Sequence, residues 1–284
     1  MMRYTTGRGK YGIEKKPKKP INRRKIVGLV IVIIVASGLL FVYNYGLPST
    51  SFHSELWYPQ QISKSSVFFS ISLLYDCTLN ISFVDEEDLV YRMDIRLSEP
   101  AFASDAFVLT VSHSWARGYG SVSVSFKGAI IRTTATPVLV EEVQLVLGSA
   151  TPYDILISGS NVNSSITFGN NMTASESSLF YSATGSNLNI SFTEDMVFGS
   201  SGMEVRVSED LPDYVNLFAD LPSGVNGTLS TTSVLERVLV NGWTYRPDPY
   251  PPYVTTYSTN SLNPEPLLSL QVDAVYRVRA WLVD

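Results

Sequence analysis

The chain has 284 residues, of which 45% are hydrophobic and 17% charged, and it contains one cysteine. This length is enough for two ordinary domains, and a lone Cys77 excludes an intrachain disulfide. No P-loop, HExxH or GxSxG motif is present, and we expect no cofactor, no metal site, no catalytic residues and no enzymatic activity.

The first 25 residues form a strongly basic segment. They hold ten Lys and Arg residues and one acidic residue, whereas the remainder holds 11 basic and 25 acidic residues. Residues 1–25 also lack apolar periodicity, so we predict a disordered cytoplasmic tail. Membrane topology explains its charge, and contact with anionic lipid headgroups is an additional role, so we expect no nucleic-acid partner.

An uncharged apolar run follows at residues 26–43. Eighteen helical residues at ~1.5 Å each span about 27 Å, close to the ~30 Å hydrocarbon core of a bilayer. We therefore predict a transmembrane anchor at 26–45 whose partner is the lipid bilayer, with a cleaved signal peptide as the alternative. The basic residues before the run place the N-terminus in the cytoplasm and the rest outside the cell.

After a linker at residues 46–58, the sequence changes to short runs in which apolar and polar residues alternate. These runs are rich in β-branched and aromatic residues and are bounded by Gly, Pro, Asp or Ser, as β-strands are. The predicted strands include 66–75, 78–84, 90–98, 106–114, 120–126, 140–148 and 153–159. The exported part is thus predicted to be mainly β.

The five residues LNISF occur twice, at 79–83 and at 188–192. Each copy is followed by an acidic linker and then by a similar segment, MDIRLSE at 93–99 and MEVRVSE at 203–209. The offset of 109–110 residues matches one immunoglobulin-sized domain. We therefore predict an internal duplication, with two tandem Ig-like antiparallel β-sandwich domains at 59–160 and 161–284. A single fused sandwich is the alternative.

Within LNISF, the Leu, Ile and Phe side chains share one strand face and the Asn and Ser side chains share the other. The apolar face is predicted to enter the core. The outward Asn and Ser also form an N-x-S sequon, and three more sequons follow. The candidate N-glycosylation sites are Asn80, Asn163, Asn171, Asn189 and Asn226.

Acidic turns and histidines are the residues that could bind a metal ion. The run at 85–88 and the cluster of Glu209, Asp210 and Asp213 are interpreted as solvated turns, with Ca²⁺ binding as the alternative. Two histidines, His53 and His113, are too few for a His-rich metal site.

The most unusual stretch is the Pro- and Tyr-rich segment 243–257. Its prolines exclude a central strand, and its rings and Arg are typical of binding surfaces. A loop that covers the sandwich edge is the alternative. The candidate partner-binding residues are Trp243, Tyr245, Arg246, Tyr250, Tyr253 and Tyr257.

These features favour a membrane-anchored cell-surface protein with a structural, adhesive or partner-binding role at the envelope, where a protein or a glycan is the expected partner. Two other classes stay open. One is an accessory or stator subunit of a surface appendage or secretion machine, and the other is an extracytoplasmic hydrolase with a dispersed site.

Overall fold

The structure is a computed structural model that describes residues 23–59, 66–73, 76–102, 109–116, 119–126, 139–185, 187–208, 214–247, 254–259, 267–273 and 277–283. It contains two compact units, residues 1–46 and residues 47–284. The predicted tail at 1–25 lies almost entirely outside the described residues.

The first unit contains one helix, α1 (Arg23–Tyr45), over the predicted apolar run. The side chains of residues 27–43 are described, and they are apolar and exposed along most of the helix. Across the described residues, no helix is both long enough and apolar enough to cross a membrane.

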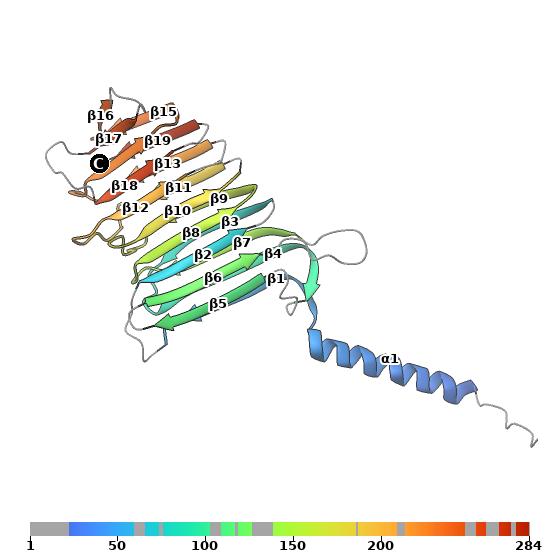
Figure 1. The fold of residues 1–284 in the computed structure, drawn as a ribbon. Coiled ribbons are helices and arrows are strands. Elements are labelled where there is room, and N and C mark those ends of the chain that lie inside the picture. The colour runs from blue at the N-terminus through green and yellow to red at the C-terminus, as the bar shows by residue number, and fades with distance from the viewer. Residues whose placement is uncertain are drawn as a thin grey trace, which may run out of the picture. The chain divides into compact units, whose positions relative to one another are not determined.

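The second unit is built from two β-sheets (Figure 1). Sheet A has nine strands in the order β1 (Pro48–Trp57), β4 (Leu89–Phe102), β7 (Val140–Gly148), β3 (Cys77–Val84), β9 (Val162–Phe168), β11 (Asn187–Phe192), β13 (Tyr214–Asp220), β19 (Arg277–Val283) and β15 (Val234–Asn241). Sheet B has ten strands in the order β16 (Thr244–Pro247), β17 (Thr255–Ser258), β14 (Gly227–Thr231), β18 (Leu268–Val272), β12 (Met203–Val207), β10 (Ser178–Ala183), β8 (Tyr153–Gly159), β2 (Val67–Leu73), β6 (Tyr119–Phe126) and β5 (Leu109–Ala116).

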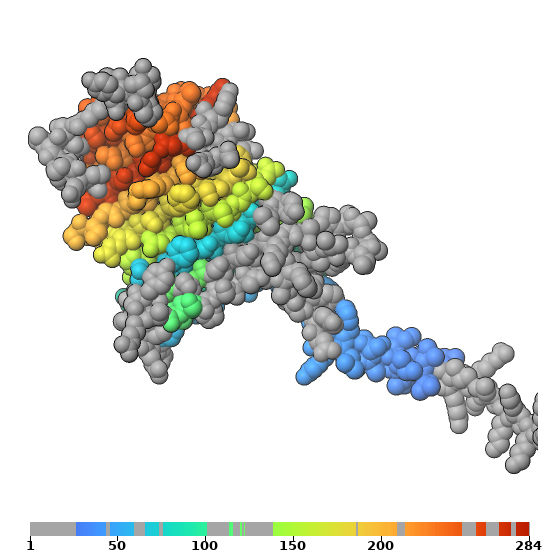
Figure 2. Space-filling view, viewed as in Figure 1, coloured from blue at the N-terminus to red at the C-terminus, as the bar shows by residue number. Residues whose placement is uncertain are grey.

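The central strands pair in parallel and form layers, each with one strand in either sheet. Successive layers β8/β9, β10/β11 and β12/β13 stack in register, so Ser178 lies beside Asp154, 24 residues earlier, and Asn216 lies beside Asn189, 27 residues earlier. Figure 2 shows the side chains of β2, β8, β10 and β12 as parallel bands across the face of sheet B. This stacking resembles a β-solenoid in which each layer repeats the one before.

The prediction of a mainly β fold with two facing sheets is confirmed, but the tandem Ig-like arrangement is not what the structure shows. The central pairs are parallel, whereas Ig-like sheets are antiparallel. Both sheets run through residue 160, because β3 pairs with β9 and β2 pairs with β8. Residues 47–284 therefore form one unit without a boundary near residue 160.

The repeated LNISF segments lie in β3 and β11, with β9 between them. They are two layers of one stack, and their separation of 109 residues is large because the segment from β4 to β7 is inserted in the chain between β3 and β8. The pattern of the intervening β9, VNSSITF, has the same alternation of inward and outward residues. The repeat thus reports a shared layer position rather than a duplicated domain.

The order of the layers departs from chain order at both ends of the stack. The layer β2/β3 lies between β6/β7 and β8/β9, and the layer β18/β19 lies between β12/β13 and β14/β15 (Figure 1). Antiparallel strands flank the parallel stack, namely β1 and β4 in sheet A and β5, β16 and β17 in sheet B. The Pro-rich segment contributes the short strand β16 at the edge of sheet B, where a strand that contains Pro is expected.

The core lies between the sheets and is lined by the inward residues of every layer. An aromatic column runs along sheet A, where Phe168 packs against Phe83 at 5.6 Å and stacks on Phe192 at 5.1 Å between ring centroids. Two buried tyrosines are hydrogen-bonded, Tyr181 to Ser164 at 2.9 Å and Tyr153 to the carbonyl of Val90 at 2.7 Å. The core is thus apolar, and the hydroxyls of these two tyrosines are satisfied within it.

Candidate functional site: the outward face of sheet A

In-register parallel pairing turns the outward positions of sheet A into rows that cross the strands. Residues of neighbouring strands lie about 4.8 Å apart along such a row. The central outward row consists of His53, Asp94, Gln144, Asn80, Ser165, Asn189, Asn216, Arg279 and Arg237. Its chemistry changes along the sheet, from ion pairs through amides and hydroxyls to arginines.

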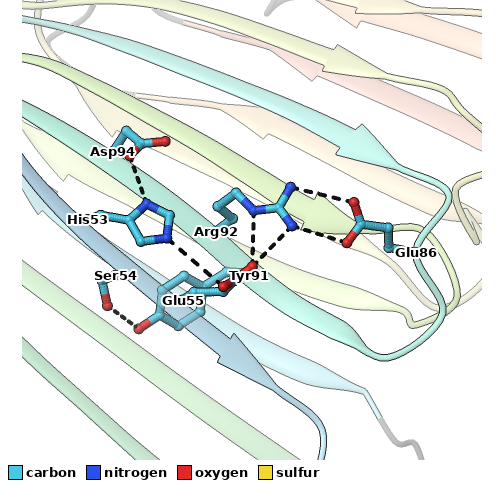
Figure 3. A network of polar contacts seen from close by, with 7 residues as sticks. All are labelled: His53, Ser54, Glu55, Glu86, Tyr91, Arg92 and Asp94. Carbon is cyan, nitrogen blue, oxygen red and sulfur yellow. Dashed lines mark hydrogen bonds and ion pairs between the residues drawn. The ribbon is translucent and has the colours of Figure 1, made fainter.

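The first zone is an ion-pair cluster on β1 and β4 (Figure 3). His53 Nδ1 lies 2.8 Å from Asp94 Oδ1, and the Arg92 guanidinium bridges Glu55 at 3.0 Å and Glu86 at 3.2 Å. The hydrogen bond from Arg92 to Glu86 is the main cause that raises the pKa of Arg92, and the hydrogen bond to Glu55 is the second. The two glutamates share one guanidinium and Asp94 contacts His53, so this zone ties the edge strand β1 to β4 and its carboxylates outnumber its arginine.

The same cluster contains His53, one of the two histidines of the chain. Ser54 follows His53 on β1, and successive strand residues point to opposite faces. Ser54 Oγ instead meets Tyr91 Oη at 3.0 Å (Figure 3). His53 is therefore held by a carboxylate and has no contact with the serine beside it. His113 lies in β5, but its side chain is outside the described residues.

The second zone is an open pocket of about 540 Å³ over β3, β9 and β11. It is lined by Thr78, Asn80, Asn163, Ser164, Ser165, Asn187 and Asn189, all of which are polar and uncharged. Asn216 Nδ2 donates to Asn189 Oδ1 at 2.8 Å, which leaves Asn189 Nδ2 without a partner among the described residues. At the β7 side, Asn80 Nδ2 donates a long hydrogen bond of 3.4 Å to Glu142 Oε1.

The third zone is an aromatic and arginine cluster on β13, β19 and β15. Phe218 and Trp281 are direct register partners, and their rings stack at 4.4 Å with an interplanar angle of 7°. Phe218 remains 39% exposed. Nearby, the Arg279 guanidinium lies 4.6 Å from the Tyr214 ring centroid, a cation–π distance. Stacked rings on a water-facing surface are typical of recognition sites rather than of a sheet exterior.

Glu236 neutralises part of the charge in this cluster. It accepts a hydrogen bond from Arg277 at 3.1 Å and another from Arg279 at 2.5 Å. The bond from Arg279 is the main cause that lowers the pKa of Glu236. Two cations against one carboxylate leave a locally positive surface beside the stacked rings.

The predicted partner-binding residues fall into three groups. Trp243 is only 5% exposed, and its ring lies so close to Gly227 that a Cβ there would meet it at 2.7 Å, so it closes the core instead of facing a partner. Tyr245, which is 53% exposed, and Tyr257 form a tilted pair on β16 and β17 with centroids 5.3 Å apart. Tyr250, Tyr253 and the side chain of Arg246 lie outside the described residues.

Three of the five predicted sequon asparagines, Asn80, Asn163 and Asn189, line the pocket. Asn171 lies in a turn with φ of 59° and donates to Asp85 at 3.3 Å, and Asn226 is half-buried. Glycosylation of all five stays a prediction.

Asp85, at the start of the acidic turn, also accepts from Ser149 Oγ at 3.2 Å. In the ranges that the structure describes, no three His, Cys, Asp or Glu side chains gather as metal ligands would. Glu209, Asp210 and Asp213 lie outside those ranges. Burial, aided by Asp76, raises the pKa of Cys77 to about 11, so its thiol stays protonated near neutral pH.

Sequence reasoning missed Tyr214, Phe218, Arg279 and Trp281. Phe218 and Trp281 lie 63 residues apart in sequence and meet only because β13 and β19 pair in parallel. A local signal was present, since YVNLFAD and RVRAWLV both place large aromatic or cationic residues at alternate positions that an outward face would share.

Comparisons with known proteins add information on the fold. No family model matches the sequence, and no curated protein matches it. Among solved structures, a protein from Clostridium sporogenes ATCC 15579, described provisionally as a cell adhesion protein, is similar with a TM-score of 0.54 and 13% sequence identity. The similarity covers 84% of this chain and 100% of that one. At this identity, the likeness shows that the two chains share a β-rich fold.

Proposed function

We propose that this protein is a membrane-anchored surface protein whose residues 47–284 bind a partner through the outward face of sheet A, in a structural or adhesive role. The observation that carries the proposal is the Phe218–Trp281 stack, which exposes rings that a purely structural sheet exterior would not need. The provisional description of the similar Clostridium protein as an adhesion protein is in keeping with this role.

The anchor is proposed from the sequence, because no membrane span is identified among the described residues. Residues 26–45 would enter the bilayer, residues 1–25 would stay in the cytoplasm, and the β unit would lie outside. Protease added to intact cells should then degrade residues 47–284 and spare the tail. Protection of the β unit until the cells are lysed would reject this topology.

Partner binding is tested with cells that display the full chain on their surface. The measurement is the adhesion of these cells to matrices of envelope proteins and glycans. Removal of the stacked rings by Phe218→Ala and Trp281→Ala should abolish adhesion. Phe180→Ala is the matched control, because Phe180 has the same exposure of 39% but lies in sheet B. If display of the wild-type chain confers no adhesion, or if the control removes it equally, the proposed face is incorrect.

A further inference from the structure

We propose that the polar pocket over β3, β9 and β11 binds a neutral, linear glycan that lies across the strands, with the outer face of Phe218, in the next outward row on β13, as a stacking wall beside it. This inference names the ligand class of the face described above and rests on the proposed function. It is carried by the uncharged lining, the spacing of the outward rows and the orientation of the Phe218 ring.

The lining of the pocket matches hydroxyl groups, which both donate and accept hydrogen bonds. Amides offer donors and acceptors together, and Asn189 Nδ2 is a donor that has no partner among the described residues. Ser165 and Thr78 add hydroxyls on the neighbouring strands β9 and β3. No lining residue carries a charge, and Glu142 at the rim disfavours an anionic ligand.

The row geometry suits a chain that runs perpendicular to the strands. Asn80, Ser165 and Asn189 occupy one row on three adjacent strands, so they span roughly 10 Å at a strand spacing of ~4.8 Å. Successive sugars in an extended glycan repeat at a distance similar to this strand spacing. Each sugar would therefore meet an equivalent set of polar groups, which a compact ligand would not exploit.

The Phe218 ring flanks this path from the next outward row of sheet A, two residues beyond Asn216 on β13. Its stack with Trp281 runs between neighbouring strands, so the opposite face of the ring turns toward β11. The residue beside it in that row is Ser191, a small side chain that hydrogen-bonds Thr167 at 3.1 Å and leaves the ring face uncovered. An aromatic face bordering hydroxyl-binding amides can stack on the apolar CH face of a sugar ring.

The test measures binding of the purified full chain in detergent to cellohexaose, xylohexaose and mannohexaose by calorimetry, with hexagalacturonate as the anionic comparison. We expect saturable binding of at least one neutral probe and at least tenfold weaker binding of the anionic one. Ser165→Arg should fill the pocket and weaken binding at least tenfold. Ser158→Arg, at an outward and half-buried serine of β8 in the same layer, should leave binding unchanged.

Three results would overturn the glycan inference: no neutral probe binds, Ser165→Arg and Ser158→Arg behave alike, or mass spectrometry finds glycans on Asn80, Asn163 and Asn189 that fill the pocket. If adhesion still depends on Phe218 and Trp281 while no neutral probe binds, the glycan inference fails and the proposed function stands. If adhesion is indifferent to both rings, the proposed function fails whatever the probes show.

Discussion

The inward and outward faces of sheet A differ in how their side-chain chemistry changes from strand to strand. On the inward side, buried and mostly apolar residues recur from layer to layer, and Leu79, Ile81 and Phe83 on β3 are repeated as Leu188, Ile190 and Phe192 on β11. On the outward side, the chemistry changes along the sheet from ion pairs to amides to stacked rings. The difference indicates that the inward rows hold the stack together, whereas the outward rows are available for recognition.

The largest effect is expected from a fragment that removes part of the stack of layers and so interrupts the inward rows. A fragment of residues 55–160 keeps β3 but loses β9, its partner on one side, and it likewise separates β2 from most of sheet B. Since a stacked layer cannot bury its apolar face alone, we expect this fragment to lack cooperative unfolding, whereas residues 47–284 should unfold in one transition. Circular dichroism during thermal unfolding distinguishes the two fragments. Cooperative unfolding of the shorter fragment would show that the layers are not mutually dependent.

A single inward side chain should have the next largest effect. Phe168 is fully buried between Phe83 and Phe192, so Phe168→Ala is expected to reduce the free energy of unfolding by about 3–5 kcal/mol. The outward Phe180→Ala should cost about 1 kcal/mol or less. Denaturant titration measures both, and similar losses would remove the distinction between the two sides.

The alternation of apolar and polar residues along the sequence predicts where strands lie and which side chains point inward, but it does not predict which strands pair. Period-two patterns located β2 to β8 and the inward parity of LNISF, because burial on one face is a local property. They missed β1, which lies in the predicted linker at 46–58 and pairs with β4. They did not reveal the strand partners, because parallel pairing joins residues 24 or more positions apart and the inserted strands β4 to β7 stretch the LNISF spacing to 109. The Phe218–Trp281 stack was missed for the same reason, as it exists only after β13 and β19 pair.

Polar groups on the inward side should make stability depend on pH. Burial raises the pKa of Tyr181 to about 12 despite its hydrogen bond with Ser164. Because the folded state retains the phenolic proton more strongly than the unfolded chain, this contribution is intact below pH 10 and is lost as the pH rises toward 12. The loss should be roughly 2 kcal/mol for Tyr181.

Denaturant titrations at pH 8 to 11.5 measure this dependence. Tyr181→Phe should reduce the alkaline slope by the share of one buried phenol, even though it lowers stability at pH 8 by leaving the buried Ser164 hydroxyl without its partner. Burial likewise raises the pKa values of Tyr58, Tyr153 and Cys77, so these groups should keep the rest of the slope in this variant. An unchanged slope in Tyr181→Phe would mean that its phenol is not desolvated.

The smallest effect on stability is expected where the effect on binding is largest. Trp281 is half-buried on the outward side, where its ring stacks on Phe218 and its register partner on β15 is Leu239. Trp281→Ala should therefore lower the free energy of unfolding by about 1 kcal/mol, the scale of one aromatic pair, while abolishing adhesion of displaying cells. Trp281→Phe is the matched control, since it retains a ring for stacking and should restore most adhesion. A large loss of stability in Trp281→Ala would instead show that this ring stabilises the fold. The outward face of sheet A beyond β13 would then not be reserved for recognition.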